Sequence, residues 1–72
     1  MTTAQQIGSF IKEKRTALSI GPDDLADSAG VSRRTLFYIE NGNANPSLET
    51  LDKILDALGL QIKIVAKDEA NR

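Results

Sequence analysis

The chain has 72 residues, which is the size of a single small domain. It contains neither cysteine nor histidine, which excludes disulfide bridges, thiolate zinc sites and catalysis by Ser-His-Asp or Cys-His groups. Nine basic and ten acidic residues give a formal net charge of −1, whereas domains that bind nucleic acid are usually basic.

The first predicted element is a helix over about Ala4–Leu18. Thr3 and Gln6 have the spacing of a capping box, in which a hydroxyl and an amide side chain pair with backbone donors at the helix start. Ser19–Gly21 is expected to end the helix. The residues that follow helical spacing are Ile7, Phe10, Ile11, Lys14 and Leu18.

A second helix of about two turns is predicted to begin at Pro22, because the first helical position needs no backbone donor. Asp23 and Asp24 lie in its first turn, where negative charge is favourable to the helix dipole. Gly30 is expected to end it in a left-handed conformation. Its predicted buried face consists of Leu25, Ala26 and Ala29.

Two further helices are predicted, capped by Ser32 and Ser47. The first is expected to end at Asn41-Gly42 and to be followed by a polar loop, Asn43–Pro46. The second is expected to end at Gly59. The predicted inner residues of the first are Leu36, Ile39 and Glu40. The apolar residues at helical spacing in the second are Leu48, Leu51, Ile54, Leu55 and Leu58.

The hydrophobic period changes at residues 60–66. Leu60, Ile62 and Ile64 alternate with polar residues, which is typical of a β-strand. A lone strand has an unpaired edge, so we predict that it pairs with the same strand of a second subunit. The alternative is that these side chains fold back on the core in an extended segment. Residues 67–72 are predicted to form a flexible tail.

Residues 22–39 carry the main functional signal. Two short helices joined by Ala29-Gly30-Val31-Ser32 fit a helix-turn-helix. Ala26 has to be small, because the second of these helices crosses close to it. Val31, Leu36 and Ile39 are expected to anchor that second helix from beneath.

These residues resemble the Cro/C1-type (XRE) helix-turn-helix domains of phage repressors and bacterial regulators. The resemblance covers about Ile7–Leu60. It implies an all-α, lambda-repressor-like domain of four to five helices over residues 1–59, with residues 60–66 as a dimerisation strand. The matching residues are Leu25-Ala26, Ala29-Gly30-Val31-Ser32, Leu36, Ile39-Glu40-Asn41-Gly42 and Asn45-Pro46-Ser47-Leu48-Glu49-Thr50-Leu51.

The ending Leu58–Val65 is similar to the HipB branch of antitoxins, in which the tail strand pairs between subunits. This resemblance implies a repressor of its own type II toxin–antitoxin operon that also binds a HipA-type kinase toxin. The alternatives are a stand-alone phage-type or bacterial repressor, and a protein-interaction module that has lost DNA binding.

In a helix-turn-helix, the N-terminal residues of the second helix meet base edges in the major groove of double-stranded DNA. Arg34 is the first candidate, because both arms of an arginine can bind guanine O6 and N7. A homodimer is expected to bind a palindromic operator. The residues predicted to contact bases are Arg33, Arg34, Phe37 and Tyr38; those predicted to position phosphates are Ser32, Thr35, Asn41 and Asn43.

Simpler roles exist for the same side chains. Paired arginines on a helix can be a solvated face, and Phe37 and Tyr38 can be core or interface residues. The chain also departs from the family at the start of the second helix, where Gly21 and Pro22 replace a hydroxyl cap and a glutamine. Proline has no side-chain donor and no backbone N–H, so at least one phosphate contact is predicted to be lost.

Other function classes are disfavoured. We predict no catalytic residues, no cofactor and no small-molecule substrate, and we assign Asp23, Asp24 and Asp27 to helix-dipole and solubility roles rather than to a metal site. Met1–Ile11 lacks the basic start and apolar run of a signal peptide. No stretch approaches the roughly 20 apolar residues of a membrane span. We therefore expect a cytoplasmic protein without a membrane partner.

Overall fold

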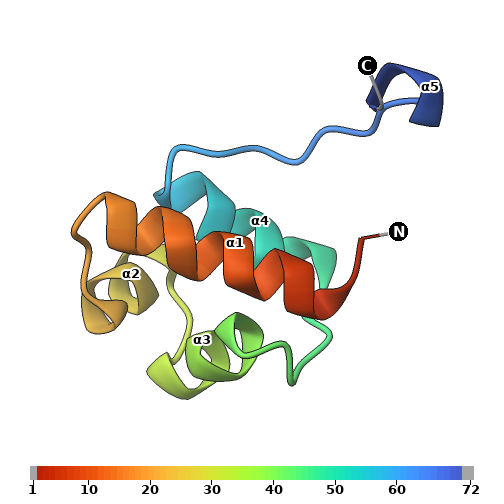
Figure 1. Cartoon of the computed structure of the whole chain (residues 1–72). Coiled ribbons are helices and arrows are strands. Elements are labelled where there is room, and N and C mark those ends of the chain that lie inside the picture. Colours follow the sequence, from red (N-terminus) through yellow and green to blue (C-terminus); the bar gives the residue numbers. More distant parts are fainter. Residues whose placement is uncertain (1, 71–72) are drawn as a thin grey trace.

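A computed structural model describes residues 2–70 of the chain, and within that range it consists of helices joined by short loops. None of the described residues forms a β-strand, so the all-α prediction is confirmed. In Figure 1, the first helix lies across one side of the molecule and the third lies below it. The helices are α1 (Ala4–Ala17), α2 (Pro22–Ala29), α3 (Arg33–Glu40), α4 (Leu48–Ala57) and α5 (Lys67–Ala70).

The helix starts agree with the predicted capping residues. Thr3 and Gln6 form the capping box: the Gln6 N–H donates to Thr3 Oγ1 at 3.1 Å, and the Thr3 N–H donates to Gln6 Oε1 at 2.9 Å. Ser32 and Ser47 accept backbone N–H groups at the starts of α3 and α4. Local hydrogen bonds therefore fix where these helices begin.

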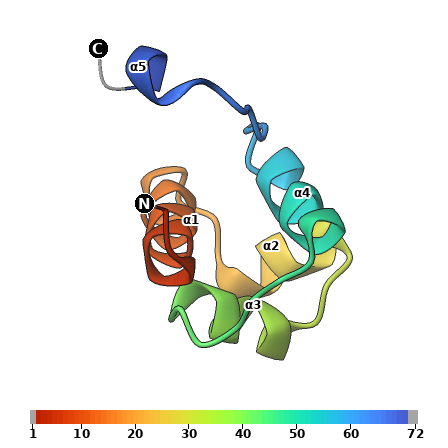
Figure 2. The same cartoon turned by 90° about the vertical axis from the view of Figure 1, so that its right-hand side faces the viewer.

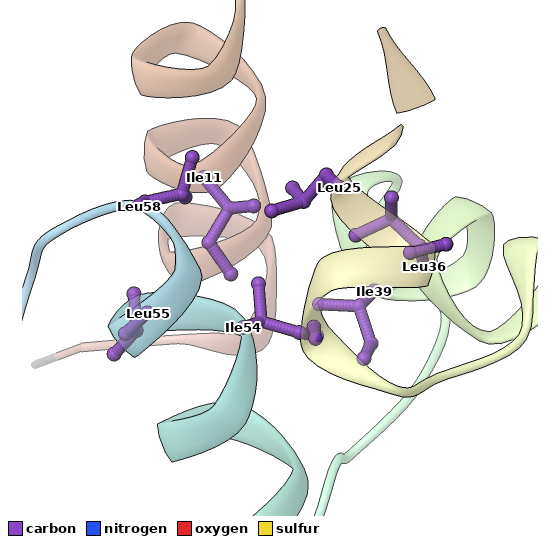
Figure 3. Close-up of a cluster of buried hydrophobic side chains, with 9 residues drawn as sticks. Ile11, Leu25, Leu36, Ile39, Ile54, Leu55 and Leu58 are labelled. Carbon is purple, nitrogen blue, oxygen red and sulfur yellow. The ribbon is translucent and has the colours of Figure 1, made fainter. Parts of the chain in front are cut away.

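The core lies where the first four helices meet. Ile11 of α1, Leu25 of α2, Leu36 of α3 and Ile54 of α4 are almost completely buried. Figure 3 shows these side chains pointing toward a common centre. Ala26, Ala29, Ile39, Leu55 and Leu58 complete the cluster. Each of the helices α1 to α4 thus contributes apolar side chains from one face to a single core.

Three apolar residues at helical spacing lie outside this core. Phe10 and Leu18 are about half exposed, and Leu48 is 69% exposed. Helical spacing alone therefore does not identify the buried positions, because α1 and α4 are buried along a narrower stripe than the spacing allows. In α1 the buried positions are Gly8 and Ile11.

The segment after α4 corrects the predicted strand. Residues 60–66 have no regular secondary structure, because a β-ladder needs a second edge and the described chain offers none. Leu60 packs partly against the core, whereas Ile64 is 94% exposed. Figures 1 and 2 both show this segment leading away from the side of the molecule that carries α3.

The segment ends in one helical turn, α5, where the sequence predicts only a flexible tail. The part of that prediction that concerns residues 71–72 lies outside the described residues. None of the helices in the described part of the chain combines the length and the hydropathy that a bilayer crossing requires.

Candidate nucleic-acid interface

The connection between α2 and α3 has the geometry of a helix-turn-helix. Gly30 ends α2 with φ 70°, a left-handed conformation that glycine adopts without strain. The Val31 N–H then donates to the Ala26 carbonyl at 3.0 Å. Ala26, Leu36 and Ile39 are buried, so α3 packs on α2 and α1 through this side and presents its other side outward.

The outward side of α3 carries all four residues predicted to contact bases. Arg33, Arg34 and Phe37 are exposed, and Tyr38 is 38% exposed. The Arg34 guanidinium carbon lies 5.7 Å from the centre of the Tyr38 ring, within the range of a cation–π contact. The Phe37 and Tyr38 rings meet edge to face, with centroids 5.7 Å apart. They therefore belong to the surface and not to the core.

Arg33 differs from Arg34 because it has a carboxylate partner. Its Nη1 lies 3.0 Å from Oδ1 of Asp23, in the first turn of α2, and both side chains are mostly exposed. Among the ion pairs of residues 2–68, whose side chains the structure describes, none involves Arg34. Arg34 is therefore the cation on this face whose charge no carboxylate offsets.

The residues predicted to position phosphates lie at the two ends of α3. At the start, Ser32 Oγ accepts the Thr35 N–H at 3.0 Å and donates to Thr35 Oγ1 at 2.8 Å. At the end, Asn41 Nδ2 donates to the Phe37 carbonyl at 2.7 Å, and the Asn43 N–H donates to the Tyr38 carbonyl. Eight residues of α-helix span about 12 Å, which is also about the width of the major groove.

Comparison with known proteins identifies the family to which the chain belongs. The model of the helix-turn-helix family matches residues 11–65, and the match contains α2, α3 and the connection between them. The chain belongs to the Cro/C1-type helix-turn-helix family. The resemblance on which the sequence analysis rested is therefore confirmed at the level of the family.

Two relatives of this helix-turn-helix domain come from Bacillus phage phi105. The chain is 36% identical to the immunity repressor protein over 69 residues, which is 96% of this chain and 45% of that protein. It is 32% identical to the ImmF control region 10 kDa protein, again over 96% of this chain and over 77% of the relative. The chain thus spans less than half the length of the immunity repressor.

Among solved structures, the domain is similar to the restriction-modification controller protein C.AhdI from Aeromonas hydrophila. The TM-score is 0.77 with 29% sequence identity, and the alignment covers 81% of this chain and 88% of that one. The two chains therefore share their fold over most of their lengths.

An ion pair that the sequence analysis did not identify ties the helix-turn-helix to α1. Arg15 Nε donates to Glu40 Oε2 at 2.7 Å, Nη2 donates to Oε1 at 3.1 Å, and Nη1 donates to the Ile20 carbonyl at 3.0 Å. Both side chains are nearly buried. The hydrogen bond to Glu40 raises the pKa of Arg15 above its ordinary value, although burial alone lowers it.

The sequence placed Glu40 on the inner side of its helix but gave it no partner. The sequence does hold a signal for this pair. Glu40 follows the inner residue Ile39, and Arg15 lies one helical turn after the inner residue Ile11. Two opposite charges at inner positions of two helices indicate an ion pair between them.

A cation of α1 was also missed. Lys12 is exposed and lines a small hollow of about 190 Å³ with Arg33 and Asn41. Pro22 lines the same hollow, so the start of α2 lies directly beside the start of α3. The Gly21 cap makes no side-chain hydrogen bond. Lys12 therefore provides a positive charge close to the position where the family's usual glutamine is absent.

Proposed function

We propose that this Cro/C1-type domain is a sequence-specific DNA-binding repressor that inserts α3 into the major groove. The observation that supports this most strongly is the outward side of α3, where Arg34 stacks on Tyr38 without a carboxylate partner. A planar guanidinium held over a ring loses little conformational freedom when it binds. It can then donate two hydrogen bonds to guanine O6 and N7.

The other side chains complete the proposed interface. Phe37 is 60% exposed beside Tyr38 and is suited to press on a thymine methyl group, while Tyr38 can donate its hydroxyl to a base or phosphate. We assign Arg33 to a base contact. The proposed phosphate contacts lie at the two ends of α3 and on α1: Ser32, Thr35, Asn41, Asn43 and Lys12.

We further propose that the repressor is a homodimer that binds a palindromic operator. The support is the apolar segment after α4, where Ile62, Ile64 and Val65 are exposed and the backbone of residues 60–66 has no ladder partner. A second copy would supply the same segment through an isologous interface. Two copies of α3 would then meet half-sites about 34 Å apart.

The two phage relatives favour a stand-alone repressor, since one is named an immunity repressor and the other a control-region protein. The HipB-like antitoxin that binds a HipA-type kinase remains a narrower proposal, supported by the resemblance of residues 58–65. Capture from the host with this protein as bait separates the two, because only the antitoxin should retain a kinase. A protein-interaction module would retain protein without specific DNA.

The proposal is tested by measuring DNA affinity for Arg34→Ala and for Lys53→Ala, which removes the same charge from α4. A site is first selected from random duplexes with the wild-type protein. Arg34→Ala should weaken binding to that site by about 5- to 150-fold. Lys53→Ala should change it by less than about twofold, since its charge is exposed and paired with Glu49.

Wild-type affinity should also fall steeply as salt is added, because phosphate contacts release counterions. A protein that selects no site and binds random duplex with no salt dependence would contradict the proposed function and favour the interaction module. Equal losses in the two variants would contradict the assignment of Arg34 to a base.

A further inference from the structure

We propose that Asp23 is a positioning residue that sets DNA specificity: its carboxylate holds Arg33 and directs that guanidinium toward uncharged base edges and away from phosphates. The inference rests on the proposed function, because it concerns how the start of α3 meets DNA. It adds a residue of α2 to an interface that otherwise consists of α3, its flanking residues and Lys12.

The geometry places the two residues at the junction of the helix-turn-helix. Asp23 is the second residue of α2 and Arg33 is the first residue of α3. Asp23 Oδ1 lies 3.0 Å from Arg33 Nη1, which is the distance of an ion pair between two exposed side chains. The pair thus spans the two helices at the end of α3 whose residues meet base edges in such motifs.

The ion pair leaves Arg33 able to bind a base. A guanidinium has five N–H donors in a planar fork, and the contact with Asp23 occupies one side of it. The remaining donors can reach guanine O6 or N7, which carry no net charge and are not repelled by the carboxylate. A base contact therefore keeps the ion pair intact.

A phosphate contact, unlike a base contact, disturbs the ion pair between Asp23 and Arg33. A phosphate brought to Arg33 would lie within several ångströms of the Asp23 carboxylate, and two negative charges at that distance repel each other. The phosphate would have to displace Asp23 or share the guanidinium with it. Asp23 therefore lowers the affinity of Arg33 for the phosphate backbone, which is the same in every sequence, more than it lowers the affinity of Arg33 for a guanine.

The surroundings of the pair strengthen this bias. Gly21 and Pro22 offer no side-chain donor to a phosphate at the start of α2, so the nearby positive charge that can bind a phosphate is that of Lys12 and not that of Arg33. Since Asp23 offsets Arg33, the outward side of α3 attracts phosphates mainly through Arg34. A repressor with a formal net charge of −1 would thus bind random DNA weakly and its own site well.

The test compares Asp23→Asn with Asp24→Asn, using the full chain, a random-sequence duplex and the site selected by the wild type. Both changes remove one negative charge from the first turn of α2, but only Asp23 is paired with Arg33. Affinity is measured over a range of salt concentrations, and thermal unfolding confirms that each variant is folded.

Asp23→Asn should bind the random duplex about five- to tenfold more tightly at low salt, and the log–log salt slope should steepen by about 0.9 per protomer for one more phosphate contact. The selected site should gain less, so discrimination falls. Asp24→Asn should change affinity by about twofold or less with an unaltered slope. Asp23→Glu, which keeps the carboxylate, should restore the wild-type slope and discrimination.

Equal effects of Asp23→Asn and Asp24→Asn would overturn the inference, since they would reveal a general charge effect only. So would an Asp23→Asn variant whose discrimination between the two duplexes is that of the wild type. In both cases the wild-type protein still binds its selected site, and the proposed function stands. A wild type that binds neither duplex contradicts the proposed function itself.

Discussion

Gly8 marks the place where the backbones of α1 and α3 come closest. A Cβ atom added there would collide with the Ile39 carbonyl oxygen and lie 3.0 Å from that of Glu40. Both obstacles are backbone atoms at the end of α3, so they cannot turn away as a side chain would. The end of α3 therefore approaches α1 as closely as it does because position 8 has no side chain.

Gly8→Ala is expected to destabilise the fold by about 1–3 kcal/mol, the cost of overpacking a tight contact. The sign of the change in the free energy of unfolding is informative. In an isolated helix alanine is more favourable than glycine by about 1 kcal/mol, so a loss of stability has to come from the tight contact with α3. Urea unfolding of the variant, with the exposed neighbour Ser9→Ala as control, measures the difference. The control should change stability by less than about 0.5 kcal/mol. A Gly8→Ala variant as stable as the wild type would show that the two helices move apart at little cost.

Between elements, the Arg15–Glu40 pair joins α1 to the end of α3. Glu40→Gln should cost about 1–3 kcal/mol, because it leaves a part-buried guanidinium without its counter-charge. The double variant Arg15→Met/Glu40→Leu should lose clearly less stability than the sum of the losses in the single variants Arg15→Met and Glu40→Leu, since two apolar groups of similar size need no partner.

Unfolding of the four proteins in this cycle measures the coupling energy. Because the hydrogen bond to Glu40 raises the pKa of Arg15, the titration of Arg15 itself removes no stability at pH values below the ordinary arginine pKa. This titration would remove stability only as the pH rises through the raised value, far into the alkaline range. Strictly additive losses would show that the two residues contribute independently. The exposed Lys53–Glu49 pair is the matched control, and Glu49→Gln should cost less than about 1 kcal/mol.

The elements themselves were largely predictable, and the contacts between them were not. The starts of α1, α2, α3 and α4 follow from caps or a proline within the first turn, which are local features of the sequence. The close approach of Gly8 to Ile39 and the Arg15–Glu40 pair join residues 25 or more positions apart. Hydrophobic alternation and capping motifs span only a few residues, so they do not predict such contacts.

The difference between local patterns and distant contacts also applies to the outward side of α3 and to residues 60–66. Arg34 and Tyr38 are one helical turn apart, so helical periodicity alone places them together on one face. The alternation in residues 60–66 is equally regular, yet a strand also needs a partner edge that no local pattern provides. The pairing of Asp23 with Arg33 was missed because it depends on the angle between α2 and α3.

For the whole molecule, the notable feature is an apolar surface on the side away from α3. A groove of about 580 Å³ lies between α1, α4 and the C-terminal segment, lined mainly by Ile7, Phe10, Leu51, Leu55, Leu60 and Ile62. Ile64 and Val65 lie exposed in the segment that continues from it. Half-buried and exposed apolar residues that gather on one side of a small domain are typical of an interaction surface. This position would leave both recognition helices of a dimer free to meet DNA.

Ile64→Lys tests the proposed dimer without disturbing the monomer, because this side chain is 94% exposed in the single chain. If Ile64 is buried between subunits, the change should weaken dimerisation by about 10- to 100-fold, as expected for a lost isoleucine contact and a charge placed in the interface. Sedimentation equilibrium over a range of concentrations measures this. Leu18→Lys, at the end of α1, introduces the same side chain at another exposed apolar position and should leave association unchanged.

The DNA measurement gives the second half of this prediction. Ile64→Lys should lose affinity for a palindrome while binding a single half-site as the wild type does, because only the dimer contacts both half-sites at once. A wild type that sediments as a monomer at all concentrations would contradict the dimer. An Ile64→Lys protein that still dimerises would instead exclude the 60–66 segment as its interface, and would leave the α1–α4 groove as the apolar surface on which a second copy can pack.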